Sequence, residues 1–181
     1  MKDQITVHLS DCPGSTAGTA SADMLIELVV QRLSLGQDVA AVKYASCQPI
    51  YNPIREQEIL QSVAHELNRI GLYQKIGRQF FRDQIEANKV IQRGLHHRWY
   101  AHPREVPAVH RNLAAEVRPK LDRITTQMMR QFKCMDELPH LRLGYIAEIV
   151  ATRYFTELSL PQLPTLHRYA AVFALRSLCT E

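Results

Sequence analysis

The chain has 181 residues, of which 46% are hydrophobic and 22% charged, so it is long enough to bury a core and has the composition of an ordinary globular protein. Its net charge of +4 comes from basic residues scattered along the chain, which argues against a nucleic-acid-binding stripe and favours a small anionic ligand. No run approaches the roughly 18 apolar residues of a membrane span.

The first 21 residues are polar and rich in Gly, Ser, Thr and Ala. We expect a flexible N-terminal segment over residues 1–21 and a single domain over residues 22–181. The segment lacks the basic start and the continuous apolar core of a signal peptide. The protein is therefore expected either to be cytoplasmic or to have lost a leader.

Apolar residues recur at three- and four-residue steps from Met24 to Val42, which predicts a first helix. We place it from about Ala22 to Ala45, with Ser21 as its N-cap. Gly36 lies inside this helix and disfavours it by about 1 kcal/mol relative to alanine, which is too little to break it.

The second helix has clear start and stop signals. After a loop that begins at Pro49, Asn52 is suited to an N-cap and Pro53 to the first helical position, where its missing N–H is not needed. Gly71 is a typical C-terminal stop, so this helix is predicted from about Pro53 to Ile70.

Helical periodicity continues to the end of the chain, and no strand-like alternation is present in the sequence. A loop covers His102 to Pro107, and Pro119 marks either a kink or a late start of the fourth helix. The fold class is therefore all-α, a single domain of about six helices. The remaining four are predicted at Ile76 to Trp99, Ala108 to Lys133, Leu141 to Leu158 and Thr165 to Leu178.

Two basic residues share one face of the first helix. Arg32 and Lys43 are eleven residues apart, which amounts to three turns plus about 20° and a separation of roughly 16 Å along the axis. Their long side chains can converge on one small anion lying between them. The ordinary alternative is that both side chains lie on a solvent-exposed basic face of the helix, but the helix is apolar around both residues.

Further polar residues join this pair. Arg55 lies in the first turn of the second helix, where the helix dipole disfavours a cation, and Glu56 beside it suits that dipole. Asn88 and Gln92 are four residues apart and so lie on one face of the third helix. Arg118 precedes the proline of the fourth helix.

The cysteines and histidines of the sequence do not predict a metal site. The four cysteines have no metal-binding spacing; they allow up to two disulfides, with three possible pairings, or buried free thiols. The adjacent His96 and His97 point about 100° apart on a helix and do not share a metal. We expect no metal and no cofactor.

Arg32, Lys43, "PIYNPIREQEIL" and "DQIEANKVIQ", in this order and spacing, resemble the all-α class of chorismate mutases. The resemblance is closest to the exported members, covers about Leu25 to Ile124 and rests most on "REQEIL". It implies an isomerase that converts chorismate to prephenate in aromatic amino acid biosynthesis, the shikimate pathway. It also implies a periplasmic or secreted homodimer whose site is enclosed by the N-terminal helices and the fourth helix.

The resemblance also implies roles for the residues that bind substrate. Arg32 and Arg118 would bind the two carboxylates, with Arg55 assisting one of them, and Asn88 stands where relatives have a serine or threonine near a carboxylate. Asn52 stands where relatives usually have aspartate, so its capping role is retained and a role for side-chain charge is not.

The reacting atoms would be contacted by three further groups. Lys43 and Gln92 would donate to the ether oxygen, and Glu56 would accept a hydrogen bond from the ring hydroxyl. Some relatives have glutamate at the position of Gln92, which must be protonated before it donates.

Two other functions fit the same residues. An isochorismate pyruvate lyase would use a related helical fold and a similar set of cations. A non-catalytic helical binding module or effector would retain the pocket without turnover, and Asn52 is the feature in its favour. Assays on both substrates, and binding of a bicyclic transition-state mimic without turnover, distinguish these from a mutase.

Overall fold

The computed structural model describes residues 17–71, 74–108, 111–134 and 164–178. Within these ranges it contains helices and no strand, which confirms the predicted all-α class; the helix predicted at Leu141 to Leu158 lies outside them. None of the described helices is long and apolar enough to cross a membrane. The five α-helices are α1 (Ala17–Ala45), α2 (Pro53–Arg69), α3 (Gln74–Ala101), α4 (Arg118–Cys134) and α6 (Pro164–Leu175).

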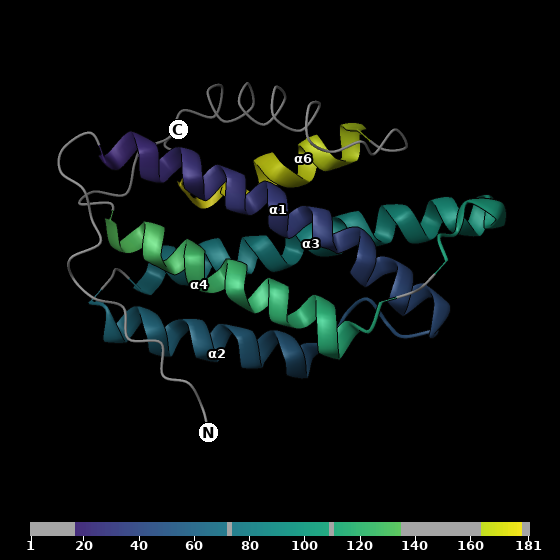
Figure 1. Ribbon diagram of the computed structural model, residues 1–181, viewed down its shortest axis with the longest axis horizontal. Helices are drawn as coiled ribbons and strands as arrows, with labels where there is room; N and C mark the ends of the chain where they lie inside the picture. The colour runs from purple at the N-terminus through teal and green to yellow at the C-terminus, as the bar shows by residue number, and fades with distance from the viewer. Residues whose placement is uncertain (1–16, 72–73, 109–110, 135–163, 179–181) are drawn as a thin grey trace.

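The two longest helices, α1 and α3, organise the others. α3 packs against α1, α2 and α6, and α1 also packs against α4 and α6. In the view of Figure 1, α6 lies above α1, and α4 and α2 lie below it. The first helix, α1, thus packs against α4, and the site described below lies in this region.

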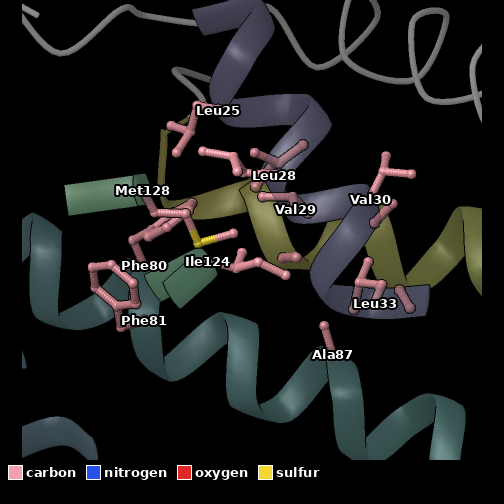
Figure 2. Packing of buried hydrophobic residues seen from close by; sticks show 14 of the residues in the cluster. Leu25, Leu28, Val29, Val30, Leu33, Phe80, Phe81, Ala87, Ile124 and Met128 are labelled. Carbon is pink, nitrogen blue, oxygen red and sulfur yellow. The ribbon is translucent and has the colours of Figure 1, made fainter. Parts of the chain in front are cut away.

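The core lies where α1, α3 and α4 meet (Figure 2). Leu25, Val29 and Leu33 of α1 are fully buried, as are Phe80 of α3 and Met128 of α4. Because α1 contacts three other helices, it is apolar on several faces rather than along one stripe.

Two polar residues of α3 are buried in the core as well. Asp83 accepts hydrogen bonds from Arg176 at 2.7 and 3.1 Å, and Gln84 donates to the carbonyl oxygen of Ala174 at 2.8 Å. Buried polar groups need such partners. The first two residues of "DQIEANKVIQ" therefore fasten α6 and the 3₁₀ turn Arg176–Leu178 to α3.

The predicted start of α1 is wrong. The helix begins at Ala17, so Ser21 is inside it and is not the N-cap. The stretch "AGTASAD" contains three alanines, and alanine has the highest helix propensity, so the helix continues past the expected cap. Its end at Ala45 agrees with the prediction.

α2 forms as its signals predict. The Asn52 side chain accepts a hydrogen bond from the backbone N–H of Arg55 at 3.0 Å, and Pro53 occupies the first helical position. Gly71, just past the end, has φ of +73°, a conformation that glycine adopts without strain. Cys47, after α1, has φ of +53° and an exposed free thiol, so it is not the buried thiol considered above.

The fourth helix starts later than predicted. Asn112 caps it by accepting from the backbone N–H groups of Ala114 and Ala115, and a π-helical turn (Leu113–Val117) precedes α4. Pro119 follows this turn directly. A proline lacks an N–H and its ring clashes with the carbonyl four residues earlier in a regular α-helix, which explains the wider turn.

The other helices differ from prediction only at their ends. α3 extends two residues beyond the predicted range at each end, from Gln74 to Ala101. The last helix, predicted at Thr165 to Leu178, is α-helical as far as Leu175. A 3₁₀ turn at Pro103–Glu105 lies within the predicted loop.

Candidate functional site

A cavity of about 270 Å³ lies between α1, α2 and α4. The loop between α1 and α2 and the π turn before α4 complete its wall. Four predicted cations contributed by three helices line this one cavity. The predicted site residues in its wall are Arg32, Lys43, Asn52, Arg55 and Arg118.

Arg32 is held in place from α4. Its Nη1 donates to the hydroxyl of Thr125 at 2.9 Å and to the carbonyl oxygen of Leu121 at 3.2 Å, and the residue is only 5% exposed. Its Nε has no hydrogen-bond partner within the described ranges. Burial lowers the pKa of Arg32 to about 10, an effect that Asp122 opposes and Arg55 reinforces. A ligand anion would compensate this buried charge.

Lys43 is anchored to the loop that follows α1. Its Nζ donates to the carbonyl oxygen of Ile50 at 2.6 Å, which uses one of three ammonium donors. Burial lowers the pKa of Lys43; Glu56 opposes this shift, while Arg118 and Lys89 add to it. Lys43 is therefore close enough to Arg118 and Lys89 for their charges to act on it, together with the carboxylate of Glu56.

Arg55 is paired in a way that the sequence analysis did not predict. Its Nη2 lies 3.1 Å from Oδ1 of Asp122, and its Nη1 lies 3.3 Å from Oε2 of Glu58. Arg55 and Asp122 also line a second cavity of about 260 Å³ between α2 and α4. This ion pair therefore forms part of the wall between the two cavities.

The π turn positions Leu113 and Arg118 together. The backbone N–H of Arg118 donates to the carbonyl oxygen of Leu113, five residues earlier, and both residues line the first cavity. In a regular α-helix, residues five apart point about 140° away from each other. The wider turn is thus the local feature that brings both side chains to one wall.

Glu56 does not line the cavity but lies beside it. Its Oε2 is 3.0 Å from Nζ of Lys89, and its charge acts on Lys43. The carboxylate is thus placed between a buried lysine of α3 and a lysine of the cavity wall.

Asn88 and Gln92 also lie outside the residues that line the cavity. Both are buried, and Nε2 of Gln92 donates to Oδ1 of Asn88 at 2.6 Å, while Oε1 of Gln92 has no partner in the described part of the chain. Asn88 packs directly on Gly36 of α1: a Cβ at Gly36 would lie 3.0 Å from its Nδ2. The missing side chain of Gly36 thus makes room for this amide pair.

The charges of the cavity wall indicate its ligand. Four cations face one carboxylate, that of Asp122, so the wall favours a small anionic molecule. Among the described residues, no group of three or more His, Cys, Asp or Glu side chains is placed to hold a metal ion.

Residues 22–93 match the family model described as chorismate mutase type II. The chain is also 30% identical over 118 residues to the secreted chorismate mutase of Mycolicibacterium smegmatis. The chain is thus similar to chorismate mutases of type II over residues 22–93. The alignment with the M. smegmatis protein covers 65% of this chain and 65% of that protein, so it spans less than two thirds of the relative's length.

Two solved structures of chorismate mutases are similar over most of the chain. The enzyme from Burkholderia phymatum has 27% sequence identity and a TM-score of 0.78, and the match covers 91% of this chain and 99% of that one. The enzyme from Burkholderia thailandensis has 26% identity and a TM-score of 0.72, and the match covers 88% of this chain and 99% of that one. The family resemblance seen in the sequence is confirmed.

Sequence reasoning missed several residues of this candidate site. Thr125 and Leu121 hold Arg32, Asp122 pairs with Arg55, and Lys89 pairs with Glu56. Asp122 lies four residues after Arg118, a spacing that would have placed it on the same helix face. Lys89 stands within "DQIEANKVIQ" itself, but nothing in the sequence shows that it reaches α2.

Proposed function

We propose that this chain is a chorismate mutase that converts chorismate to prephenate. One observation carries the proposal: Arg32, Lys43, Arg55 and Arg118, from three different helices, line one cavity of about 270 Å³. Chorismate is a small dianion, and its two carboxylates match this excess of positive charge.

The arginines bind the carboxylates of chorismate and hold the molecule in its reactive diaxial conformer. Arg32 and Arg118 bind one carboxylate each, and Arg55 assists after exchanging its ion pair with Asp122 for one with the substrate. Asn88 assists beside a carboxylate, and Asn52 keeps the start of α2, and with it Arg55, in place. Fixing the reactive conformer removes an orientation barrier from the reaction.

The reaction is a single pericyclic step. The carbon–oxygen bond of the ether breaks while a carbon–carbon bond forms, and no proton leaves or enters the substrate. Negative charge develops on the ether oxygen, and Lys43 and Gln92 stabilise it by donating hydrogen bonds. Such preorganised donors are typically worth about 3 to 4 kcal/mol each. Glu56 accepts a hydrogen bond from the ring hydroxyl and so fixes the ring.

The test is to follow loss of chorismate by purified protein at neutral pH. Chorismate and prephenate are isomers of equal mass, so the product is identified by NMR or by chromatography against a standard. Prephenate as the product supports the proposal. Release of pyruvate from isochorismate in place of prephenate formation, or tight binding of the bicyclic transition-state mimic with no turnover, overturns it.

We further infer that the protein is exported and acts as a homodimer. Support for export comes from the M. smegmatis relative, which is described as secreted. The four cations proposed to bind the substrate come from a single chain, so we infer that each subunit holds its own site. Light scattering of the purified protein tests the dimer, and fractionation of cells that produce the full-length protein tests export.

A further inference from the structure

Lys89 is a buried cation that the mechanism above does not use. Its side chain is only 7% exposed, and its Nζ lies 2.6 Å from Oε1 of Glu86 and 3.0 Å from Oε2 of Glu56. Glu86 is on the same helix, three residues earlier, whereas Glu56 belongs to the first turn of α2. The pair with Glu56 therefore links α3 to the edge of the cavity.

The two carboxylates keep Lys89 charged despite its burial. Burial alone lowers the pKa of Lys89, but the hydrogen bonds that it donates to Glu86 and Glu56, with the charges of these carboxylates, outweigh it and raise the pKa above its ordinary value. A buried ammonium is tolerated only when it is paired in this way.

Tyr51 covers the same ammonium from the loop between α1 and α2. The Nζ of Lys89 lies 5.0 Å from the centre of the Tyr51 ring, within the range of a cation–π contact. Pro49 and Asn52 of this loop line the cavity. Lys89 thus contacts both the loop and α2 where each reaches the site.

We propose that Lys89 is a positioning residue that fixes the carboxylate of Glu56 for the ring hydroxyl of the substrate. The hydrogen bond to Lys89 uses Oε2 of Glu56 and leaves Oε1 to accept from that hydroxyl. Lys89 itself is not among the residues that line the cavity, so it acts through Glu56. The proposal rests on the function proposed above.

The test compares the kinetics of Lys89→Met with those of wild-type protein acting on chorismate. The hydroxyl contact is made in both the ground state and the transition state, so its loss raises KM about tenfold and changes kcat by less than about threefold. Lys89→Arg keeps the charge and restores KM to within about threefold of wild type. Glu86→Gln is the matched control, because it removes the other partner of Lys89 and leaves Glu56 in place; its KM stays within about twofold of wild type.

A double-mutant cycle separates positioning from general stabilisation. In a Glu56→Gln background, Lys89→Met changes KM by less than about twofold, because the carboxylate it positions is gone. Lys89→Met alone leaves the carboxylate of Glu56 without its partner, and the Glu56→Gln background removes that charge. The comparison therefore remains decisive if Lys89→Met alone fails to fold. An unchanged KM in Lys89→Met, or the same tenfold rise without Glu56, overturns the proposal. Inactive wild-type protein instead refutes the proposed function.

Discussion

The guanidinium of Arg32 on α1 is fixed by Thr125 on α4, whose hydroxyl accepts from Nη1 at 2.9 Å. Thr125 in turn donates to the carbonyl oxygen of Leu121, which also accepts from Arg32. The substrate-facing arginine is therefore oriented by a closed set of hydrogen bonds before any ligand arrives. Preorganisation of this kind lowers the barrier because no reorientation is needed during the reaction.

Replacing Thr125 with valine keeps the shape of the side chain and removes the acceptor. We expect kcat/KM to fall about fivefold, the equivalent of about 1 kcal/mol for one hydrogen bond. Thr126→Val is the matched control, because the half-buried Thr126 donates its hydrogen bond to the backbone of its own helix, at Asp122. Steady-state kinetics of both variants measure the effect, and equal losses in the two would refute the role given to Thr125.

Lys43→Ala removes the proposed donor to the ether oxygen. We expect kcat to fall by at least about a hundredfold while the circular dichroism spectrum is unchanged, since loss of one such donor costs about 3 to 4 kcal/mol of transition-state stabilisation. Lys120→Ala serves as the control, because Lys120 is an exposed lysine of α4. Near-normal turnover of Lys43→Ala would remove Lys43 from the mechanism.

The pH profile distinguishes a neutral donor at position 92 from an acidic one. An amide donates at any pH, so the wild-type kcat/KM is expected to stay nearly constant from about pH 5 to 8. In Gln92→Glu the introduced carboxyl donates only when protonated, so activity falls as pH rises through its pKa. A steep loss above about pH 6 in the wild type would contradict the role of Gln92.

The same profile has an alkaline limb. Burial lowers the pKa of Lys43 below its ordinary value and that of Arg32 to about 10. Both residues are needed in the charged form, which predominates below the pKa, so kcat/KM decreases as pH rises through these lowered values. The profile of kcat/KM reports the free enzyme and is the measurement to use.

Asp122→Asn tests whether Asp122 competes with the substrate for Arg55. The exposed ion pair between them is worth at most about 1 kcal/mol, so its removal is expected to lower KM about two- to fivefold with little change in kcat. Glu58→Gln is the control, because Glu58 also pairs with Arg55 but is not among the residues that line the first cavity. A higher KM in Asp122→Asn would mean that Asp122 orients Arg55 instead.

Gly36→Ala tests the packing of Asn88 on α1. Alanine favours the helix by about 1 kcal/mol, but its Cβ would lie 3.0 Å from Nδ2 of Asn88 and displace the amide pair. We expect kcat to fall severalfold while the melting temperature changes little. Asn88→Ser in the same background shortens the displaced side chain and should restore part of kcat; no recovery would show that the loss does not arise at Asn88.

Local signals predicted most of the fold. Asn52, Pro53 and Gly71 each act through their own backbone or cap, so the limits of α2 could be read from neighbouring residues. The starts of α1 and α4 could not be read from neighbouring residues in this way. Ser21 resembles a cap but lies in an alanine-rich stretch, and the π turn before Arg118 depends on how Pro119 is accommodated.

The site was predictable to the extent that it follows helix periodicity. The shared face of Arg32 and Lys43 is a property of one helix, and both residues line the cavity. The partner of Arg32, Thr125, comes from another helix, and so does Lys89, the partner of Glu56. Such pairs depend on the tertiary arrangement, which a single sequence does not specify.

The π turn from Leu113 to Val117 has a consequence for the lengths that this segment tolerates. Removing one residue from it would return the backbone to α-helical hydrogen bonding and leave Leu113 four residues before Arg118, about 40° away on the same face. Regular α-helical bonding at the present length would instead set the two side chains about 140° apart. The wider turn therefore absorbs one residue without opening the apolar side of the cavity wall, and a single-residue deletion between Leu113 and Arg118 should be tolerated.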